Sequence, residues 1–143
     1  MSAIEASTSI PAAPEVLYER LAKLENHWDL ADRWVEVVSV NGGGDGGEVR
    51  LNGPLGLSRT ARTTVDRVDP PHLIEGTAAI GKGTLGRVRW TIGNEGEQSR
   101  VTLRAELVQA RPIDRALWSL GGRQWLETRL RVTLARLRAE YRG

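Results

Sequence analysis

The chain has 143 residues, a formal net charge of +2 and no cysteine, so it has the size of one domain with its own core and carries neither a disulfide framework nor a thiolate metal site. The absence of cysteine fits a reducing, cytoplasmic location. No basic segment followed by an apolar run opens the sequence, and no apolar stretch approaches the roughly 20 residues of a membrane-spanning helix, so we expect a soluble protein without a signal peptide.

The charges are unevenly distributed along the chain. Residues 1–36 hold seven acidic and three basic residues, whereas residues 111–143 hold eight arginines and three acids. Such polarity could attract an anion, a membrane surface or an acidic partner, but arginine runs more often form the solvated face of a helix. We therefore expect at most a weak membrane or protein contact through an Arg-rich C-terminal helix. Nucleic-acid binding is not expected, because few aromatic residues alternate with these arginines and the whole chain is close to neutral.

The first elements are a strand and two short helices. Residues 4–10 alternate between apolar and polar side chains, which predicts a half-buried strand. Pro14 suits the first turn of a helix, and the spacing of the following leucines predicts an amphipathic helix over residues 14–24. Residues 26–33, with Asn26 as a cap, are interpreted as a second short helix or turn.

The middle of the chain has the alternation of antiparallel strands. We place six of them at residues 35–41, 48–52, 58–68, 72–80, 84–93 and 98–109. The glycine-rich run 42–47 lies between two strands and lacks the Lys and Ser/Thr of a phosphate-binding loop, so it predicts a hairpin loop and no nucleotide site. Short turns between antiparallel neighbours produce a meander with one face on the core and one in water.

The spacing becomes helical after residue 112. Five large side chains fall on one stripe of this helix: Leu126, Leu130, Leu134, Leu137 and Tyr141. A continuous helix over residues 113–141 would be roughly 43 Å long. The adjacent pair Gly121-Gly122 costs about 1 kcal/mol per residue relative to alanine, so we expect a kink, a break or a close approach to the sheet there.

These elements predict one α+β domain over residues 1–143. A twisted sheet of about seven strands curls, and the long C-terminal helix lies across its concave face. A curved sheet and a straight helix cannot touch everywhere, so we expect a space between them that can hold a ligand.

Two segments resemble a known family. The run Ile10-Pro11-Ala12-Ala13-Pro14-Glu15-Val16-Leu17-Tyr18, with Leu21 and Trp34 after it, and the turn Val68-Asp69-Pro70-Pro71-His72-Leu73 are similar to the START-like polyketide cyclase/dehydrase and lipid-transport (SRPBCC) superfamily. The resemblance implies the helix-grip (START-like) fold and a hydrophobic cavity, but no catalytic residue, because this superfamily shares none. Its members include lipid carriers, aromatase/cyclases, quinone-binding proteins, co-chaperones and hormone receptors, so fold alone does not give the function.

The tryptophans are the first candidates for the wall of the cavity. Trp90 alternates in phase with Val88, and Trp118 and Trp125 lie seven residues apart on one side of the last helix. Ordinary core filling is the competing interpretation, because a buried tryptophan contributes a large apolar area in any fold. The residues predicted to line the cavity are Trp28, Trp34, Thr63, Val65, Ile74, Val88, Trp90, Leu103, Trp118, Gly122, Trp125 and Leu126.

Charged residues on the strands could add chemistry if they faced inward. The strand residues considered are Arg62, Glu75, Arg87 and Arg89. Arg87 and Arg89 alternate with Trp90, so they point outward if Trp90 points inward, which also avoids the cost of burying a charge. His27 and His72 are far apart and have no acidic residues at ligand spacing, so neither a metal site nor a cofactor is expected, and the catalytic residues stay unassigned.

Three functions are compatible with this sequence. The first is binding or transport of a small apolar or amphipathic molecule, such as a lipid, polyketide or quinone, by a monomer or homodimer. The second is a polyketide aromatase/cyclase-type enzyme, which would need a polar residue inside the cavity to position its substrate. The third is an interaction module, such as a co-chaperone or a partner of a membrane complex, that acts through the Arg-rich helix.

Overall fold

The computed structural model describes residues 3–22, 35–40, 46–52, 58–81 and 83–141, with the backbone alone for residues 35–40. In these ranges seven antiparallel strands form one sheet in the order β1-β7-β6-β5-β4-β3-β2. The strands are β1 (Ala3–Ile10), β2 (Val35–Val40), β3 (Gly46–Asn52), β4 (Ser58–Asp69), β5 (Leu73–Ile80), β6 (Thr84–Glu95) and β7 (Gln98–Gln109). The helices are α1 (Pro14–Leu21), α3 (Pro112–Leu117) and α4 (Arg123–Ala139).

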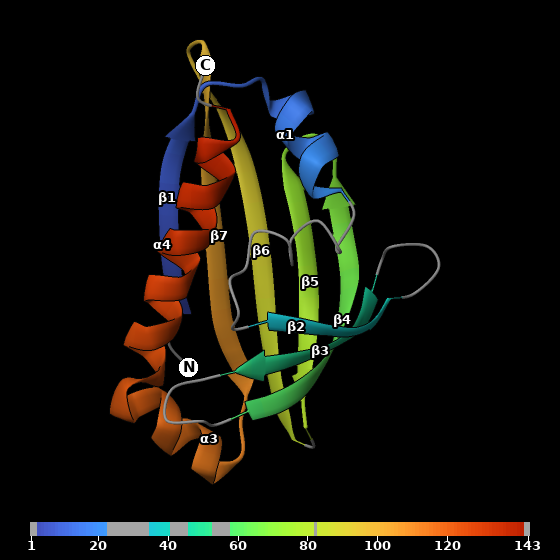
Figure 1. Ribbon diagram of the computed structural model, residues 1–143, viewed down its shortest axis with the longest axis vertical. Coiled ribbons are helices and arrows are strands. Elements are labelled where there is room, and N and C mark those ends of the chain that lie inside the picture. The colour runs from blue at the N-terminus through green and yellow to red at the C-terminus, as the bar shows by residue number, and fades with distance from the viewer. Residues whose placement is uncertain (1–2, 23–34, 41–45, 53–57, 82, 142–143) are drawn as a thin grey trace.

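The sheet is strongly curved. Figure 1 shows α4 alongside β7 and β1, whereas β2 and β3 cross in front of β5 and β6. Part of the curvature comes from bulges, because the register shifts between Val65 and Arg67 in β4 and between Leu85 and Gly86 in β6. The concave face is the one that carries the buried side chains of Ile74, Trp90 and Leu103.

The α+β fold with a curved antiparallel sheet and a long C-terminal helix is confirmed, with differences at some boundaries. Gly46 and Gly47, predicted in the hairpin loop, pair with Thr64 and Thr63 and belong to β3, since backbone atoms suffice for a sheet ladder. Helix α1 ends at Leu21, and residues 23–24 of the predicted helix lie outside the described ranges. The predicted second short helix, residues 26–33, also lies outside the described residues.

The C-terminal part of α4 is fixed to the sheet and to α1 by apolar packing. Leu17 and Leu21 of α1 and Leu137 of α4 are fully buried in the core. The hydroxyl of the buried Ser99 donates a hydrogen bond of 2.6 Å to the carbonyl of Ala12, in the turn after β1. Strand β1, α1 and the start of β7 are therefore joined at this end of the molecule.

A two-point ion pair also connects α1 to the residues after α4. Arg20 Nε and Nη2 donate to the two carboxylate oxygens of Glu140 at 2.8 and 3.0 Å. The neighbouring Tyr141 is partly buried, and this burial raises the pKa of its hydroxyl above the ordinary value. The Glu140 carboxylate adds to the rise in pKa, and Arg20 opposes it.

The C-terminal helix is broken where the glycine pair predicts an interruption. A single π-helical turn, Trp118–Gly122, separates α3 from α4, and Gly121 within it has φ 131° and ψ −14°, a conformation that favours glycine. No atom of the described residues lies within 4 Å of a Cβ built on Gly121. The interruption is therefore a change of backbone direction, and the alternative of a close approach to the sheet at Gly121 is wrong.

Helix α3 and the turn after it lie against the sheet without a buried residue of their own, and Leu120 is 84% exposed. Within the part of the chain that the structure describes, no helix is both long enough and apolar enough to cross a membrane.

Candidate ligand cavity

A cavity of about 810 Å³ lies between the concave face of the sheet and the segment from α3 to α4. Side chains from β3, β4, β5, β6 and β7 form one wall, and α3, the π-helical turn and the first half of α4 form the other. Ligand pockets in proteins commonly measure roughly 300–1,000 Å³, so this cavity has room for an organic molecule of ordinary size.

All the described residues predicted for the wall border this cavity. They are Thr63, Val65, Ile74, Val88, Trp90, Leu103, Trp118, Gly122, Trp125 and Leu126. Their role in holding a ligand stays a prediction. Trp28 and Trp34 lie outside the described residues.

The cavity is also bordered by apolar or small residues that the sequence interpretation did not predict for its wall. They include Val49, Leu51, Ala61, Gly76, Ala78, Ile80, Gly86, Ala105, Leu107, Leu117 and Leu130. Most follow the two-residue alternation of their strands, in phase with Ile74, Trp90 or Leu103, so the alternation itself could have identified them.

One end of the cavity is polar. Arg59 at the start of β4 forms an ion pair with Asp114 in α3, with 2.7 Å between Nη2 and Oδ1. The buried Thr84 hydroxyl donates a hydrogen bond to Oδ2, the other oxygen of Asp114. The same hydroxyl accepts a hydrogen bond of 3.3 Å from the Arg111 backbone N–H. These four residues, which we call the polar end, join α3 to the first residues of β4 and β6.

The hydroxyls of other inward threonines already bond to the protein. Thr63 donates to the carbonyl of Gly47 at 3.2 Å, and Thr133 donates to the carbonyl of Arg129 at 2.9 Å. Such internally satisfied hydroxyls add little to recognition of a polar ligand. The charged groups of Arg59 and Asp114 are therefore the main inward-facing polar chemistry in the described wall.

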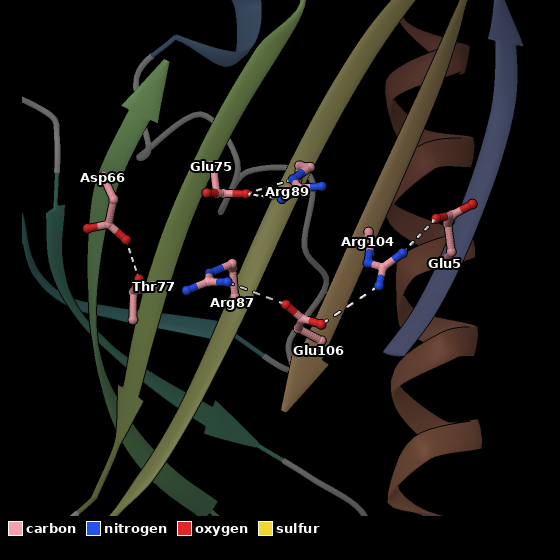
Figure 2. Close-up of polar contacts among 8 residues, drawn as sticks. All are labelled: Glu5, Asp66, Glu75, Thr77, Arg87, Arg89, Arg104 and Glu106. Carbon is pink, nitrogen blue, oxygen red and sulfur yellow. Dashed lines mark hydrogen bonds and ion pairs between the residues drawn. The ribbon is translucent and has the colours of Figure 1, made fainter. Parts of the chain in front are cut away.

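The opposite face of the sheet carries a network of exposed ion pairs (Figure 2). Arg87 pairs with Glu106 at 3.6 Å, and Arg89 pairs with Glu75 at 2.6 Å. Arg87 and Glu106 belong to residues that border the cavity, but Figure 2 shows their side chains on the face away from α4. Arg62 is exposed as well. The outward direction predicted for Arg87 and Arg89 thus agrees with the structure.

The histidines and acidic residues that the structure describes do not form a group that could bind a metal ion. His72 Nδ1 lies 2.7 Å from the carbonyl oxygen of Ile92, which fixes the turn between β4 and β5. His27 lies outside the described residues.

A family model described as polyketide cyclase/dehydrase and lipid transport matches residues 1–142. The chain belongs to this family. The polyketide cyclase/dehydrase and lipid-transport family has a ligand-binding fold, and in this member the cavity between sheet and helix is where a ligand would fit.

Solved structures show the same helix-grip, START-like fold. The protein TTHA0849 from Thermus thermophilus is 21% identical, with 96% of this chain and 95% of that chain covered and a TM-score of 0.73. A START superfamily protein from Mycobacterium smegmatis is 12% identical, with 97% and 96% covered and a TM-score of 0.66. The Aha1 dimer from Colwellia psychrerythraea is 16% identical, with 99% and 96% covered and a TM-score of 0.59.

At these identities the likeness shows the fold alone. A search of curated proteins gives no significant match.

Proposed function

We propose that this family member binds a small hydrophobic or amphipathic molecule, such as a lipid, a polyketide or a quinone, inside the cavity. The observation that carries the proposal is the volume of about 810 Å³ within a wall built mainly of aliphatic side chains and three tryptophans. Side chains that face such a volume lose packing contacts, and an apolar molecule would restore them. We also propose a cytoplasmic location, which the cysteine-free sequence supports.

A neighbouring pair of alanines on β5 allows a matched test. Ala78 borders the cavity, whereas Ala79 is exposed on the opposite face of the same strand. We expect Ala78→Trp to weaken binding of the neutral fluorescent probe Nile red at least about tenfold, because the new side chain occupies the space that the probe needs. Fluorescence titration at fixed salt measures the affinity of each variant.

Ala79→Trp is the control, since it adds the same side chain on the solvent face. It should bind Nile red as the unmodified protein does. If all three proteins bind Nile red with the same affinity, the probe binds outside the cavity and the proposal is wrong. The proposal is also wrong if the unmodified protein does not bind Nile red.

An aromatase/cyclase activity is the second candidate, and the Arg59–Asp114 pair supports it because positioning of a flexible substrate needs polar groups inside the cavity. Incubation with a linear poly-β-ketone thioester separates the two candidates. A binding protein returns the substrate with the same product distribution as buffer, whereas a cyclase changes the ring that forms.

A further inference from the structure

We propose that the polar end of the cavity recognises the carboxylate of an amphipathic carboxylic acid, whose apolar body lies along the rest of the cavity. This inference rests on the proposed function, because it assigns the ligand class of the same cavity. It is carried by the way in which two guanidinium groups and the Thr84 hydroxyl surround the single carboxylate of Asp114.

Both oxygens of the Asp114 carboxylate already have partners in the protein. Its Oδ1 lies 2.7 Å from Arg59 Nη2, and its Oδ2 accepts from the Thr84 hydroxyl and lies 3.7 Å from Arg111 Nε. Its side chain is 12% exposed. Asp114 is therefore committed first to these groups of the protein, and its charge is balanced by them.

The guanidinium of Arg59 is the group with capacity to spare. A guanidinium has five N–H donors, more than the ion pair between Nη2 and a single Asp114 oxygen can use. The Arg59 side chain is 32% exposed and borders the cavity. The polar end thus presents donors to a ligand, which favours a group that only accepts hydrogen bonds.

The charge of the polar end matches one negative charge. Arg59 borders the cavity and Arg111 lies behind Asp114 with its side chain 43% exposed, so two positive charges surround the one negative charge of Asp114. The excess of one positive charge balances a carboxylate, whose planar oxygens also fit a guanidinium, whereas a phosphate monoester would bring a second negative charge. Because the remaining wall is mainly apolar, the ligand class is an acid with a long or polycyclic hydrocarbon body.

A matched pair of probes tests the inference. We would titrate 11-(dansylamino)undecanoic acid and its methyl ester, which differ in the negative charge and one methyl group, into the whole protein at pH 7.5. The unmodified protein should bind the acid about 10- to 100-fold more tightly than the ester, as expected for one charge-assisted hydrogen-bonding group. In Arg59→Gln the two affinities should converge to within about threefold, because the charged acid loses much more affinity than the neutral ester.

Two further variants separate recognition from a structural role of the ion pair. Asp114→Asn removes the competing negative charge, so it should tighten acid binding a few-fold and leave the ester unchanged. A pair that only holds α3 on the sheet would instead make Arg59→Gln and Asp114→Asn weaken both probes equally, which contradicts the inference. Arg104→Gln, on the outer face, is the control for charge alone and should behave as the unmodified protein.

Instability of Arg59→Gln would not obscure the result. The double variant Arg59→Gln/Asp114→Asn keeps a neutral hydrogen-bonding pair, and it should bind Nile red normally while losing the preference for the acid. Normal Nile red binding with no preference for the acid in the unmodified protein overturns this inference but leaves the proposed function standing. Failure of Ala78→Trp to reduce Nile red binding overturns the proposed function instead.

Discussion

At the scale of single residues, the direction of each side chain decides whether it meets the cavity or the solvent. Trp90 is 3% exposed and borders the cavity, while the side chain of its neighbour Arg89 is 42% exposed and pairs with Glu75 on the other face. Positions without a side chain matter equally, because a glycine can mark a place where two strands leave no room for a Cβ atom.

Gly76 in β5 is such a place. A Cβ atom built there would lie 2.6 Å from the carbonyl oxygen of Thr64, a main-chain atom that cannot rotate away. We expect Gly76→Ala to lower the free energy of unfolding by about 1–3 kcal/mol, the range typical of overpacking. Urea denaturation followed by tryptophan fluorescence measures the change.

Gly93 in β6 serves as the matched control for this substitution. No atom of the described residues lies within 4 Å of its Cβ position. Gly93→Ala should leave stability unchanged within about 0.5 kcal/mol or raise it slightly, because alanine loses less conformational entropy on folding. Equal losses in both variants would show that the steric contact at Gly76 is not the cause.

The sequence predicts part of the site at this scale. Arg59 is in phase with the predicted wall residues Thr63 and Val65, so alternation along β4 could have placed it inside the cavity. Asp114 could not be found in this way. Its contact with Arg59 depends on how α3 lies against a strand 55 positions earlier in the chain, and local spacing carries no information about that placement.

At the scale of elements, the break between α3 and α4 shapes the wall of the cavity. Trp118 lies at its beginning and Trp125 lies just beyond it, and both border the cavity. Figure 1 shows α3 turned away from the direction of α4. The break therefore lets one helical segment follow the sheet while the next one closes an end of the space.

Gly121 makes this change of direction possible, since φ 131° is unfavourable for a residue with a Cβ atom. We expect Gly121→Ala to lower the free energy of unfolding by about 1–3 kcal/mol, the usual cost of such backbone strain. Urea denaturation followed by circular dichroism measures it. Ser119→Ala, at an exposed position two residues earlier, should change stability by less than about 0.5 kcal/mol, and a comparable loss there would refute the strain argument.

The order and type of the described elements follow from sequence patterns because strands repeat every two residues and helices every 3.6. The paired glycines likewise identify where the last helix is interrupted. The angle between α3 and α4 is not predictable from them, because it depends on the polar contacts of α3 with β4 and β6 at the polar end.

At the scale of the whole molecule, the two faces of the sheet perform different tasks. The concave face encloses the cavity and the core, and the outer face carries ion pairs that extend from β1 across β7 and β6 to β5 (Figure 2). The outer pairs Glu5–Arg104, Arg104–Glu106 and Arg87–Glu106 are 3.6–3.8 Å apart, and their side chains are 29–53% exposed. Exposed pairs contribute only about 0–1 kcal/mol each, so stability comes mainly from the concave side.

Two adjacent residues of β1 allow the contributions of the two faces to stability to be compared. Ile4 is 2% exposed in the core, whereas the side chain of Glu5 is 53% exposed and pairs with Arg104. Ile4→Ala should lower the free energy of unfolding by about 2–5 kcal/mol. Glu5→Gln should lower it by less than about 1 kcal/mol. Chemical denaturation of both variants at the same ionic strength gives the comparison, and the reverse ranking would contradict it.

The strand order has a consequence for how the chain folds as it is synthesised. Among the described strands, each strand from β2 to β6 pairs with the next one in the chain, whereas the partner of β1 is β7, from Ala3 with Glu106 to Ile10 with Ser99. During synthesis β1 therefore stays unpaired until β7 has left the ribosome. Closure of this long loop opposes rapid folding, and until then β6 or β7 presents an open edge to other chains.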